Sequence, residues 1–143
     1  MQTFLPYANF AQTASVLDDK RLGKQRVETL QIMTALVTHQ GWVNHPATRM
    51  WLGYEYSLLE YQAAICFEWH IVRGYQDTCL RKTSEMFWRA PYLFEDHCDP
   101  FWLGDEKFHL AHQSNLLRKN FDHYGPMGWD VPDNLEYIWP ESF

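Results

Sequence analysis

The stretch Leu17-Asp-Asp-Lys-Arg-Leu-Gly-Lys-Gln-Arg-Val-Glu28 decides the fold expected of this chain. Each residue of a helix advances by about 100°, so one sector of roughly 100° collects four polar side chains: Lys20, Arg21, Lys24 and Glu28. The apolar residues between Leu22 and Leu36 point away from that sector. We therefore expect a helix with one face in the core and the other available for chemistry or for an anion. An ordinary solvated face is the alternative.

The first forty residues predict an extended arm and two helices. Pro6 interrupts the apolar pattern at the N-terminus, which favours extended backbone over a helix start. The polar residues before each apolar stretch are suited to cap a helix. The predicted elements are an arm over residues 1–8, a helix over residues 10–15 capped by Asn9, and a long helix from Asp18 or Asp19 to about His39.

The rest of the chain predicts more helix, followed by a coil. Pro46 suits the first turn of a helix over residues 46–72, and a further helix covers residues 105–118. Residues 83–95 fit either a short helix or a loop, because Pro91 lies among them. Gly and Pro are frequent from residue 125 onward. This tail should be a coil ordered by its aromatic side chains, among them Trp129, Tyr137 and Trp139.

The composition bounds the class of protein. With 143 residues the chain fits one domain, residues 1–143, which is long enough to bury a core. Its three cysteines lack a CxxC spacing, and no signal-like apolar segment precedes the arm, which favours a reduced cytoplasmic compartment without disulfides. No apolar run approaches the ~20 residues that span a bilayer. We expect a cytoplasmic monomer without membrane contact.

The charge distribution bears on nucleic acid as a partner. A formal net charge of −6 disfavours DNA, because phosphate contacts favour basic proteins. The positive charges are nevertheless clustered: Lys20, Arg21, Lys24 and Arg26 form one group, and Arg118 and Lys119 form another. Within a Debye length of about 10 Å, this local distribution counts more than the total. The net charge weakens the expectation of DNA binding without excluding it.

No standard nucleotide or metal motif stands in the sequence. The glycine-rich phosphate loop, GxSxG and HExxH are absent. His97 and Cys98 could join His109 and His112 in a zinc set, but their spacing matches no standard pattern. Neutral imidazoles on a half-buried helix face also hydrogen-bond readily. We expect the latter role for the two helical histidines, and neither a metal nor a cofactor.

Glu28 has two interpretations. Beside Lys24 on an open surface it would form an ordinary ion pair. In a cleft with amines within about 4–6 Å, the same carboxylate would stay ionised and could stabilise a cationic intermediate or move protons. An ordinary α-amino group has a pKa of about 7.7–8.0, so a chain terminus near Glu28 would be a ready imine-forming nucleophile.

Several motifs resemble those of the pyrimidine-dimer DNA glycosylase (endonuclease V-like) family, and in particular a bacterial branch of it. The motifs are residues 17–28, His45-Pro46 with Trp51-Leu52-Gly53, Glu68-Trp69, Arg73-Gly74-Tyr75, His112-Gln-Ser-Asn-Leu-Leu-Arg-Lys119 and Val131-Pro-Asp-Asn-Leu-Glu-Tyr-Ile-Trp139-Pro140. They cover most of the chain in order. The likeness to the founding member itself rests mainly on the first long helix and on the segment after His45-Pro46.

The resemblance implies a compact all-α fold and a DNA glycosylase that is also an AP lyase. In the family, an N-terminal α-amine attacks the sugar C1′ at a damaged pyrimidine and forms an imine, assisted by a glutamate that Glu28 matches. The founding member exposes a small residue after losing its initiator Met, whereas Gln2 is bulky and Met1 should be retained. The expected catalytic residues are Glu28 with the amine of Met1 or Gln2, or else Lys20 or Lys24.

Damaged or modified double-stranded DNA is the partner that the resemblance implies. The residues expected to contact it are Arg21, Lys24, Arg26, His45, Arg49, His112, Arg118 and Lys119. Trp51 and Trp88 could stack on bases, against the more usual fate of packing in the core. Two alternatives stay open: a DNA-binding protein without catalysis, and an enzyme that acts on a free modified nucleotide or nucleoside.

Overall fold

The structure, a computed structural model, describes residues 1–140. The last three residues of the expected 1–143 domain lie outside this range. The α-helices are α1 Phe10–Val16, α2 Asp19–Thr38, α3 Pro46–Arg49, α4 Glu55–Phe67, α5 Cys79–Phe87, α6 Glu106–Lys119 and α7 Phe121–Tyr124. One π-helical segment, η1 Glu68–Val72, continues α4, and two 3-10 turns are η2 Pro91–Phe94 and η3 Gly125–Met127. No strand occurs within residues 1–140, so the all-α prediction is confirmed.

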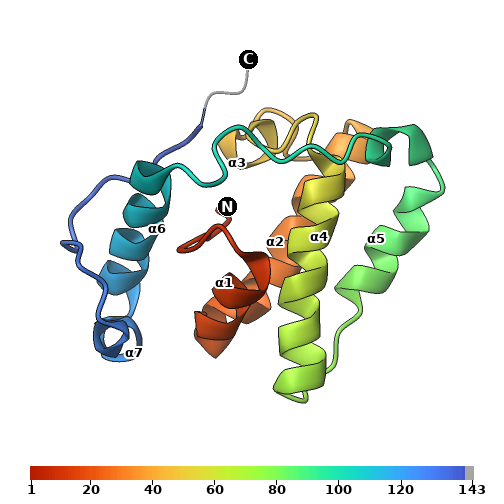
Figure 1. The fold of residues 1–143 in the computed structure, drawn as a ribbon. Helices are drawn as coiled ribbons and strands as arrows, with labels where there is room; N and C mark the ends of the chain where they lie inside the picture. Colours follow the sequence, from red (N-terminus) through yellow and green to blue (C-terminus); the bar gives the residue numbers. More distant parts are fainter. Residues whose placement is uncertain (141–143) are drawn as a thin grey trace.

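The helices pack around one apolar core. Helix α2 packs against α4 and α5, and α1 packs against α4. Figure 1 shows α5 beside α4 on one side of the molecule, with α6 and α7 on the other and the N-terminus in the space between. The largest fully buried side chains come from several of these segments: Leu5, Leu22, Ile32, Met33, Trp51, Leu58, Tyr61, Ile65, Phe108 and Tyr124.

Helix α2 begins and ends where the sequence predicts. Asp18 occupies the N-cap position, and His39 adopts the left-handed conformation (φ 59°) with its N–H bonded to the Ala35 carbonyl. The Asp18 carboxylate, however, does not cap the helix. It accepts hydrogen bonds from Tyr124 Oη and from Arg21 Nη1, the latter at 3.1 Å. The cap position is therefore used to join α2 to α7.

The prediction of one continuous helix over residues 46–72 is wrong. Helix α3 ends at Arg49, and a turn separates it from α4, which begins at Glu55. Gly53 has a φ of +85°, a conformation that only glycine adopts easily, and its N–H donates to the Glu55 carboxylate at 3.3 Å. The turn buries Met50 and Trp51 completely. Burial of these side chains and the conformation of Gly53 outweigh the local helical pattern.

The segment over residues 83–95 contains both of the predicted structures. Helix α5 occupies its first part, and Pro91 starts the 3-10 turn η2. The predicted short helix over residues 10–15 and the helix over residues 105–118 are confirmed as α1 and α6. The tail lies as a coil against the core, packed there by Trp129, Tyr137 and Trp139, as expected.

The N-terminal arm, residues 1–8, is extended as predicted, but it is not peripheral. A terminal extended arm usually contributes little to a core, but this arm is part of it. Thr3, Phe4 and Leu5 are all buried, and the latter two belong to the main core cluster. The position of the arm therefore depends on the packed core.

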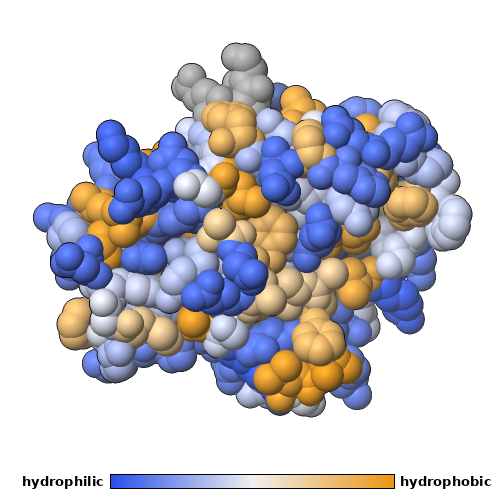
Figure 2. Space-filling model, viewed as in Figure 1, coloured by the Kyte–Doolittle hydropathy of each residue, from blue (hydrophilic) through white to orange (hydrophobic). Residues whose placement is uncertain are grey.

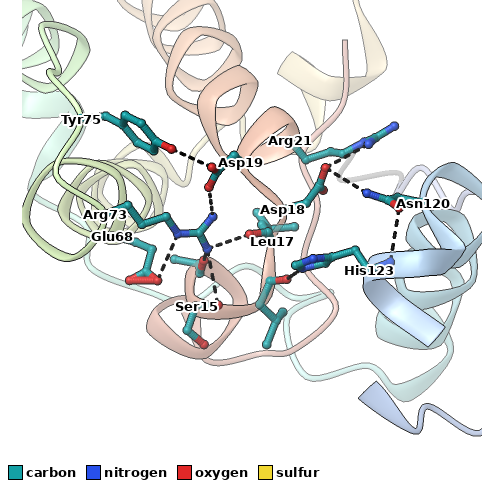
Figure 3. A network of polar contacts seen from close by, with 12 residues as sticks. Ser15, Leu17, Asp18, Asp19, Arg21, Glu68, Arg73, Tyr75, Asn120 and His123 are labelled. Carbon is teal, nitrogen blue, oxygen red and sulfur yellow. Dashed lines mark hydrogen bonds and ion pairs between the residues drawn. The ribbon is translucent and has the colours of Figure 1, made fainter. Parts of the chain in front are cut away.

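A polar network ties the ends of four segments together (Figure 3). The Arg73 guanidinium pairs with Asp19 at 2.7 Å, donates to the Leu17 carbonyl at 2.7 Å and lies 3.5 Å from Glu68. Burial would raise the pKa of Asp18, but its hydrogen bonds from Tyr124 and Arg21 outweigh this effect and lower the pKa. These contacts hold the start of α2 against α1, η1 and α7.

The far end of α4 carries an apolar surface. In Figure 2, hydrophobic side chains gather at the lower end of the molecule, where α4 passes into η1. Phe67, Ile71 and Val72 are the exposed apolar residues of that segment. Within residues 1–140, no helix combines the length and the hydropathy needed to cross a bilayer.

Candidate active site

Side chains from two helices, α2 and α6, hold the backbone of the N-terminal arm. The Gln2 N–H donates to Glu28 Oε2 at 3.1 Å, and the Phe4 N–H donates to Gln25 Oε1 at 3.1 Å, both on α2. The Leu5 N–H donates to His112 Nδ1 on α6 at 2.8 Å. Because the arm has no strand partner, these side chains satisfy backbone groups that would otherwise be buried without hydrogen bonds.

Glu28 lies beside the start of the chain. Its Oε2 accepts from Gln25 Nε2 as well as from the Gln2 N–H, each at 3.1 Å. Burial, and then the charge of the Met1 ammonium, lower the pKa of His45, while the Glu28 carboxylate opposes them. The terminal amine and Glu28 are therefore both close enough to His45 to act on its charge. The cleft interpretation of Glu28 fits this geometry better than an open-surface ion pair.

A polar pocket of about 250 Å³ opens in front of Glu28. It is lined by Gln2, Phe4, Lys20, Arg21, Lys24, Glu28 and Lys119. Lys119 comes from the end of α6, and the other cations come from the first two turns of α2. Partial burial, and then the charges of Arg21, Arg118 and Lys24, lower the pKa of Lys119, with Glu28 opposing. The pocket thus gathers four cations around a single carboxylate.

An apolar hollow of about 500 Å³ lies along the same face of α2. We call it the Trp69 trough; it is lined by Asp19, Lys20, Gly23, Lys24, Val27, Glu28, Gln31 and Trp69. Trp69 is held by its Nε1 donating to the Gln76 carbonyl at 2.9 Å and by its contact with Tyr75. A Cβ on Gly23 would lie 3.0 Å from the Trp69 ring, so glycine lets the ring approach the helix. Glu28 borders both hollows.

The predicted site residues divide into two groups. Those that the fold brings to the polar pocket or its edge are Met1, Gln2, Lys20, Arg21, Lys24, Glu28, His45 and Lys119. Arg21 lines the pocket while it pairs with Asp18 at 3.1 Å. His45 also caps α3, because its Nδ1 accepts the Ala47 N–H at 3.0 Å.

The other predicted DNA-contacting residues lie elsewhere. Arg26 pairs with Asp77 at 2.7 Å and lies over the Trp69 ring, so its guanidinium is engaged within the protein. Arg118 donates to the Asp133 carbonyl at 2.7 Å and so binds the tail. His112 is fully buried and supports the arm through Leu5. Arg49 is exposed at the end of α3 and lines neither hollow.

The two candidate stacking residues also have different positions. Trp51 is 0% exposed and packs against Tyr61 and Trp102, so it belongs to the core and not to a DNA-facing surface. Trp88 is 78% exposed at the end of α5, and it lines neither hollow. Trp69, which the sequence interpretation named within a family motif but not as a stacking residue, is the tryptophan that borders Glu28.

The histidines of α6 hydrogen-bond, as their metal-free interpretation predicts. His109 Nδ1 lies 2.8 Å from the Leu5 carbonyl, and His112 accepts the N–H of the same residue. Burial lowers the pKa of both imidazoles. Within residues 1–140, no group of three or more His, Cys, Asp or Glu side chains is arranged to hold a metal ion.

Sequence reasoning missed Gln25, which contacts both the arm and Glu28. Its position three residues before Glu28 on the helix was the available signal, since residues at i and i+3 lie on neighbouring parts of a helix face. The convergence of Lys119 with Glu28 had no local signal, because these residues belong to α6 and α2.

Comparison with known proteins gives the site its context. The family model of the pyrimidine dimer DNA glycosylases matches residues 1–83, more than half of the chain. No curated protein and no solved structure matches. The family match includes the arm, Glu28 and the Trp69 trough, while α6 and Lys119 lie beyond it. The sequence match and the arrangement around Glu28 agree, and the chain belongs to the pyrimidine dimer DNA glycosylase family.

Proposed function

We propose that this protein is a DNA glycosylase with AP lyase activity that acts on damaged or modified pyrimidines in double-stranded DNA through an amine–DNA imine. The observation that carries the proposal is the 3.1 Å hydrogen bond from the Gln2 N–H to Glu28, at the edge of a cationic pocket. It brings the start of the chain to Glu28, whose carboxylate lines this pocket. The proposed enzyme is a cytoplasmic monomer that needs no cofactor.

The proposed first step joins the Met1 amine to the sugar. The unprotonated amine attacks C1′, the C1′–N bond to the pyrimidine breaks, and the base leaves with the electron pair and takes up a proton. The attached amine then loses a proton and the C1′–O4′ bond breaks, with O4′ taking up a proton from water, so that the sugar ring opens and a cationic iminium ion forms. The adjacent Glu28 carboxylate stabilises this cation electrostatically. In the lyase step the same carboxylate accepts a proton from C2′, and the 3′ phosphate leaves.

The cations of the pocket support a phosphate backbone as the ligand. Lys20, Lys24 and Lys119 line the pocket together with Arg21, although the whole chain has a net charge of −6. Phosphate contacts of this kind release counterions and make binding fall steeply with salt. The local charge favours DNA more than the total charge disfavours it.

The Trp69 trough supports an opened duplex. Chemistry at a sugar requires that the damaged nucleotide be unstacked, which costs a few kcal/mol and least at a lesion. An apolar surface bordered by Trp69 and Val27 lies directly beside Glu28. A nucleobase displaced from the stack would find an apolar surface there while its phosphates face the cations of the pocket.

Covalent trapping tests the proposal. Sodium borohydride should reduce the imine and link the protein to a duplex that carries one abasic site, and peptide mapping should locate the adduct at Met1. An adduct at Lys20, Lys24 or Lys119 would transfer the nucleophilic role to that lysine. Saturated binding without any adduct would favour a non-catalytic DNA-binding protein, whereas activity confined to free nucleosides would favour the second alternative.

A further inference from the structure

Gln25 connects the arm, Glu28 and α4 through one buried amide. The side chain is 0% exposed and lies near the middle of α2, one turn before Glu28. Its Nε2 donates to the Gln2 carbonyl at 2.8 Å and to Glu28 Oε2 at 3.1 Å. Its Oε1 accepts the Phe4 N–H at 3.1 Å and the Tyr61 hydroxyl at 2.7 Å.

These partners leave the amide one orientation. The Gln2 carbonyl can only accept hydrogen bonds, and so can the ionised Glu28 carboxylate, so the NH₂ group must face them. The Phe4 N–H can only donate, so the amide oxygen must face it. A flipped amide would put donor against donor and acceptor against acceptor in a buried site. The side chain therefore has a defined position relative to both the arm and the carboxylate.

We infer that Gln25 is a positioning residue for the reaction proposed above: it sets the distance between the start of the chain and the Glu28 carboxylate. The inference rests on the proposed function. Two of its hydrogen bonds reach the arm on either side of Thr3, and a third reaches the carboxylate that the Gln2 N–H also contacts. Without the amide, the arm would retain its hydrogen bonds to α6. Its only remaining hydrogen bond to Glu28 among the described residues would be the one from the Gln2 N–H.

A change of Gln25 to glutamate gives this inference a distinctive pH dependence. Gln25→Glu keeps the shape of the side chain but turns an oxygen toward the Gln2 carbonyl and the Glu28 carboxylate. When ionised, the new carboxylate repels both groups. When protonated, its single O–H can donate to one of them and no longer repels the other by its charge, while the other oxygen still accepts the Phe4 N–H.

The groups facing this site determine which charges matter. The titratable side chains around it are Glu28 on α2, Tyr61 on α4, His112 on α6 and Tyr137 on the tail, and the Met1 amine is on the arm. Burial raises the pKa of both tyrosines and lowers the pKa of His112, so these three stay neutral. Glu28, the terminal amine and the cations that line the polar pocket with Glu28 are left as the charged groups that Gln25→Glu would sense.

The experiment measures single-turnover strand cleavage of a duplex with one abasic site as a function of pH. At neutral pH, Gln25→Glu should be about a hundredfold slower than the wild type, the order of loss expected from a displaced reacting group. The ratio of its rate to the wild-type rate should rise as the pH falls. Gln25→Leu, which cannot regain a donor, should stay slow at every pH.

Gln113→Glu is the matched control. Gln113 is also a buried glutamine that holds the arm, since its Nε2 donates to the Pro6 carbonyl at 2.9 Å, but it has no hydrogen bond to Glu28. The ratio of the Gln113→Glu rate to the wild-type rate should change much less with pH, because its new carboxylate does not face Glu28. Ratios for Gln25→Glu that coincide with those of Gln113→Glu, or a Gln25→Leu variant with the wild-type rate, would overturn the inference.

A second measurement separates this inference from the proposed function. Wild-type protein that neither cleaves nor is trapped on abasic DNA would overturn the proposed function itself. In that case, hydrogen exchange at the Phe4 amide tests whether Gln25 still positions the arm. Gln25→Leu should accelerate this exchange, and Gln113→Leu should not. Unchanged exchange in Gln25→Leu would overturn the inference. If Gln25→Leu does not fold, exchange at the Phe4 amide is measured in Gln25→Glu instead. Exchange should be faster at a pH where the new carboxyl is ionised than at a pH where it is protonated, each relative to the wild type at the same pH, and an equal ratio at both would overturn the inference.

Discussion

The two sides of α2 carry similar charges and use them differently. On one side, Lys20 and Lys24 line the polar pocket, and neither takes part in an ion pair within residues 1–140. On the other, Arg26 is paired with Asp77 and lies over Trp69. All three residues belong to one basic cluster in the sequence. The comparison shows that two lysines of this cluster face the pocket without an ion-pair partner, whereas the charge of Arg26 is already neutralised within the protein.

The pairing of Arg26 also serves the site indirectly. Asp77 accepts the Cys79 N–H at 3.1 Å and so fixes the start of α5, while the guanidinium lies 4.5 Å from the centre of the Trp69 ring. Trp69 forms the wall of the trough beside Glu28. The structural side of α2 therefore shapes the hollow that the ligand-facing side leaves open.

The largest effect should come from the carboxylate between the two hollows. Glu28→Gln should lower the rate of base excision and strand cleavage by about 10²–10⁴-fold, the range for loss of a positioned acid–base group. Folding should be retained because the side chain is half-buried and glutamine can still accept the Gln2 N–H. Cleavage assays with thermal melts as the control measure both. A lower melting temperature with full activity would restore the ion-pair interpretation.

Removal of Arg26 should affect stability more than DNA binding. Arg26→Ala leaves the Asp77 carboxylate, whose side chain is 8% exposed, without its ion-pair partner. Loss of one member of such a buried pair costs about 3 kcal/mol. Urea unfolding should show that loss, while the salt dependence of DNA binding should stay as in the wild type. A stable variant with a shallower salt dependence would mean that Arg26 contacts phosphate after all.

The same ion pair should make the folded state sensitive to acid. Burial raises the pKa of Asp77, but hydrogen bonds from Arg26, Leu80 and Cys79 outweigh burial and lower it below 3.8. The unfolded chain therefore binds a proton more readily than the folded chain. The stabilisation is complete above the unfolded pKa and is lost as the pH falls through the folded value. Denaturant titrations from pH 6 to pH 2 should show a smaller decline for Asp77→Asn; an identical decline would assign the acid sensitivity to other carboxylates.

The smallest effect is expected on the ligand-facing side. Lys24→Ala should leave the melting temperature nearly unchanged, because the residue is exposed and makes no ion pair within the described part of the chain. It should reduce the slope of log K against log salt by about one unit, as for one lost phosphate contact. Binding of a duplex at several salt concentrations measures the slope. An unchanged slope would place the DNA away from the polar pocket.

Local pattern was sufficient for the helices and for part of the site. The spacing of Lys20, Lys24 and Glu28 on one turn after another depends only on the helical repeat, and the predicted start of α2 at Asp19 follows from the cap residue before it. Such reasoning fails for residues 50–54, which connect α3 to α4. Their local pattern is helical, but complete burial of Trp51 and the left-handed Gly53 turn the chain there.

The sequence by itself determined which residues share a helix face, because that relation reaches only three or four residues along the chain. It also indicated the family, through motifs that lie in order along the chain. Only the tertiary structure decided that the Gln2 amide meets Glu28, that Lys119 joins the same pocket and that Asp77 neutralises Arg26. Glu28 lies 26 positions from Gln2 and 91 from Lys119, and Asp77 lies 51 positions from Arg26. These residues meet because the buried arm and the packed helices bring together polar groups that need a partner.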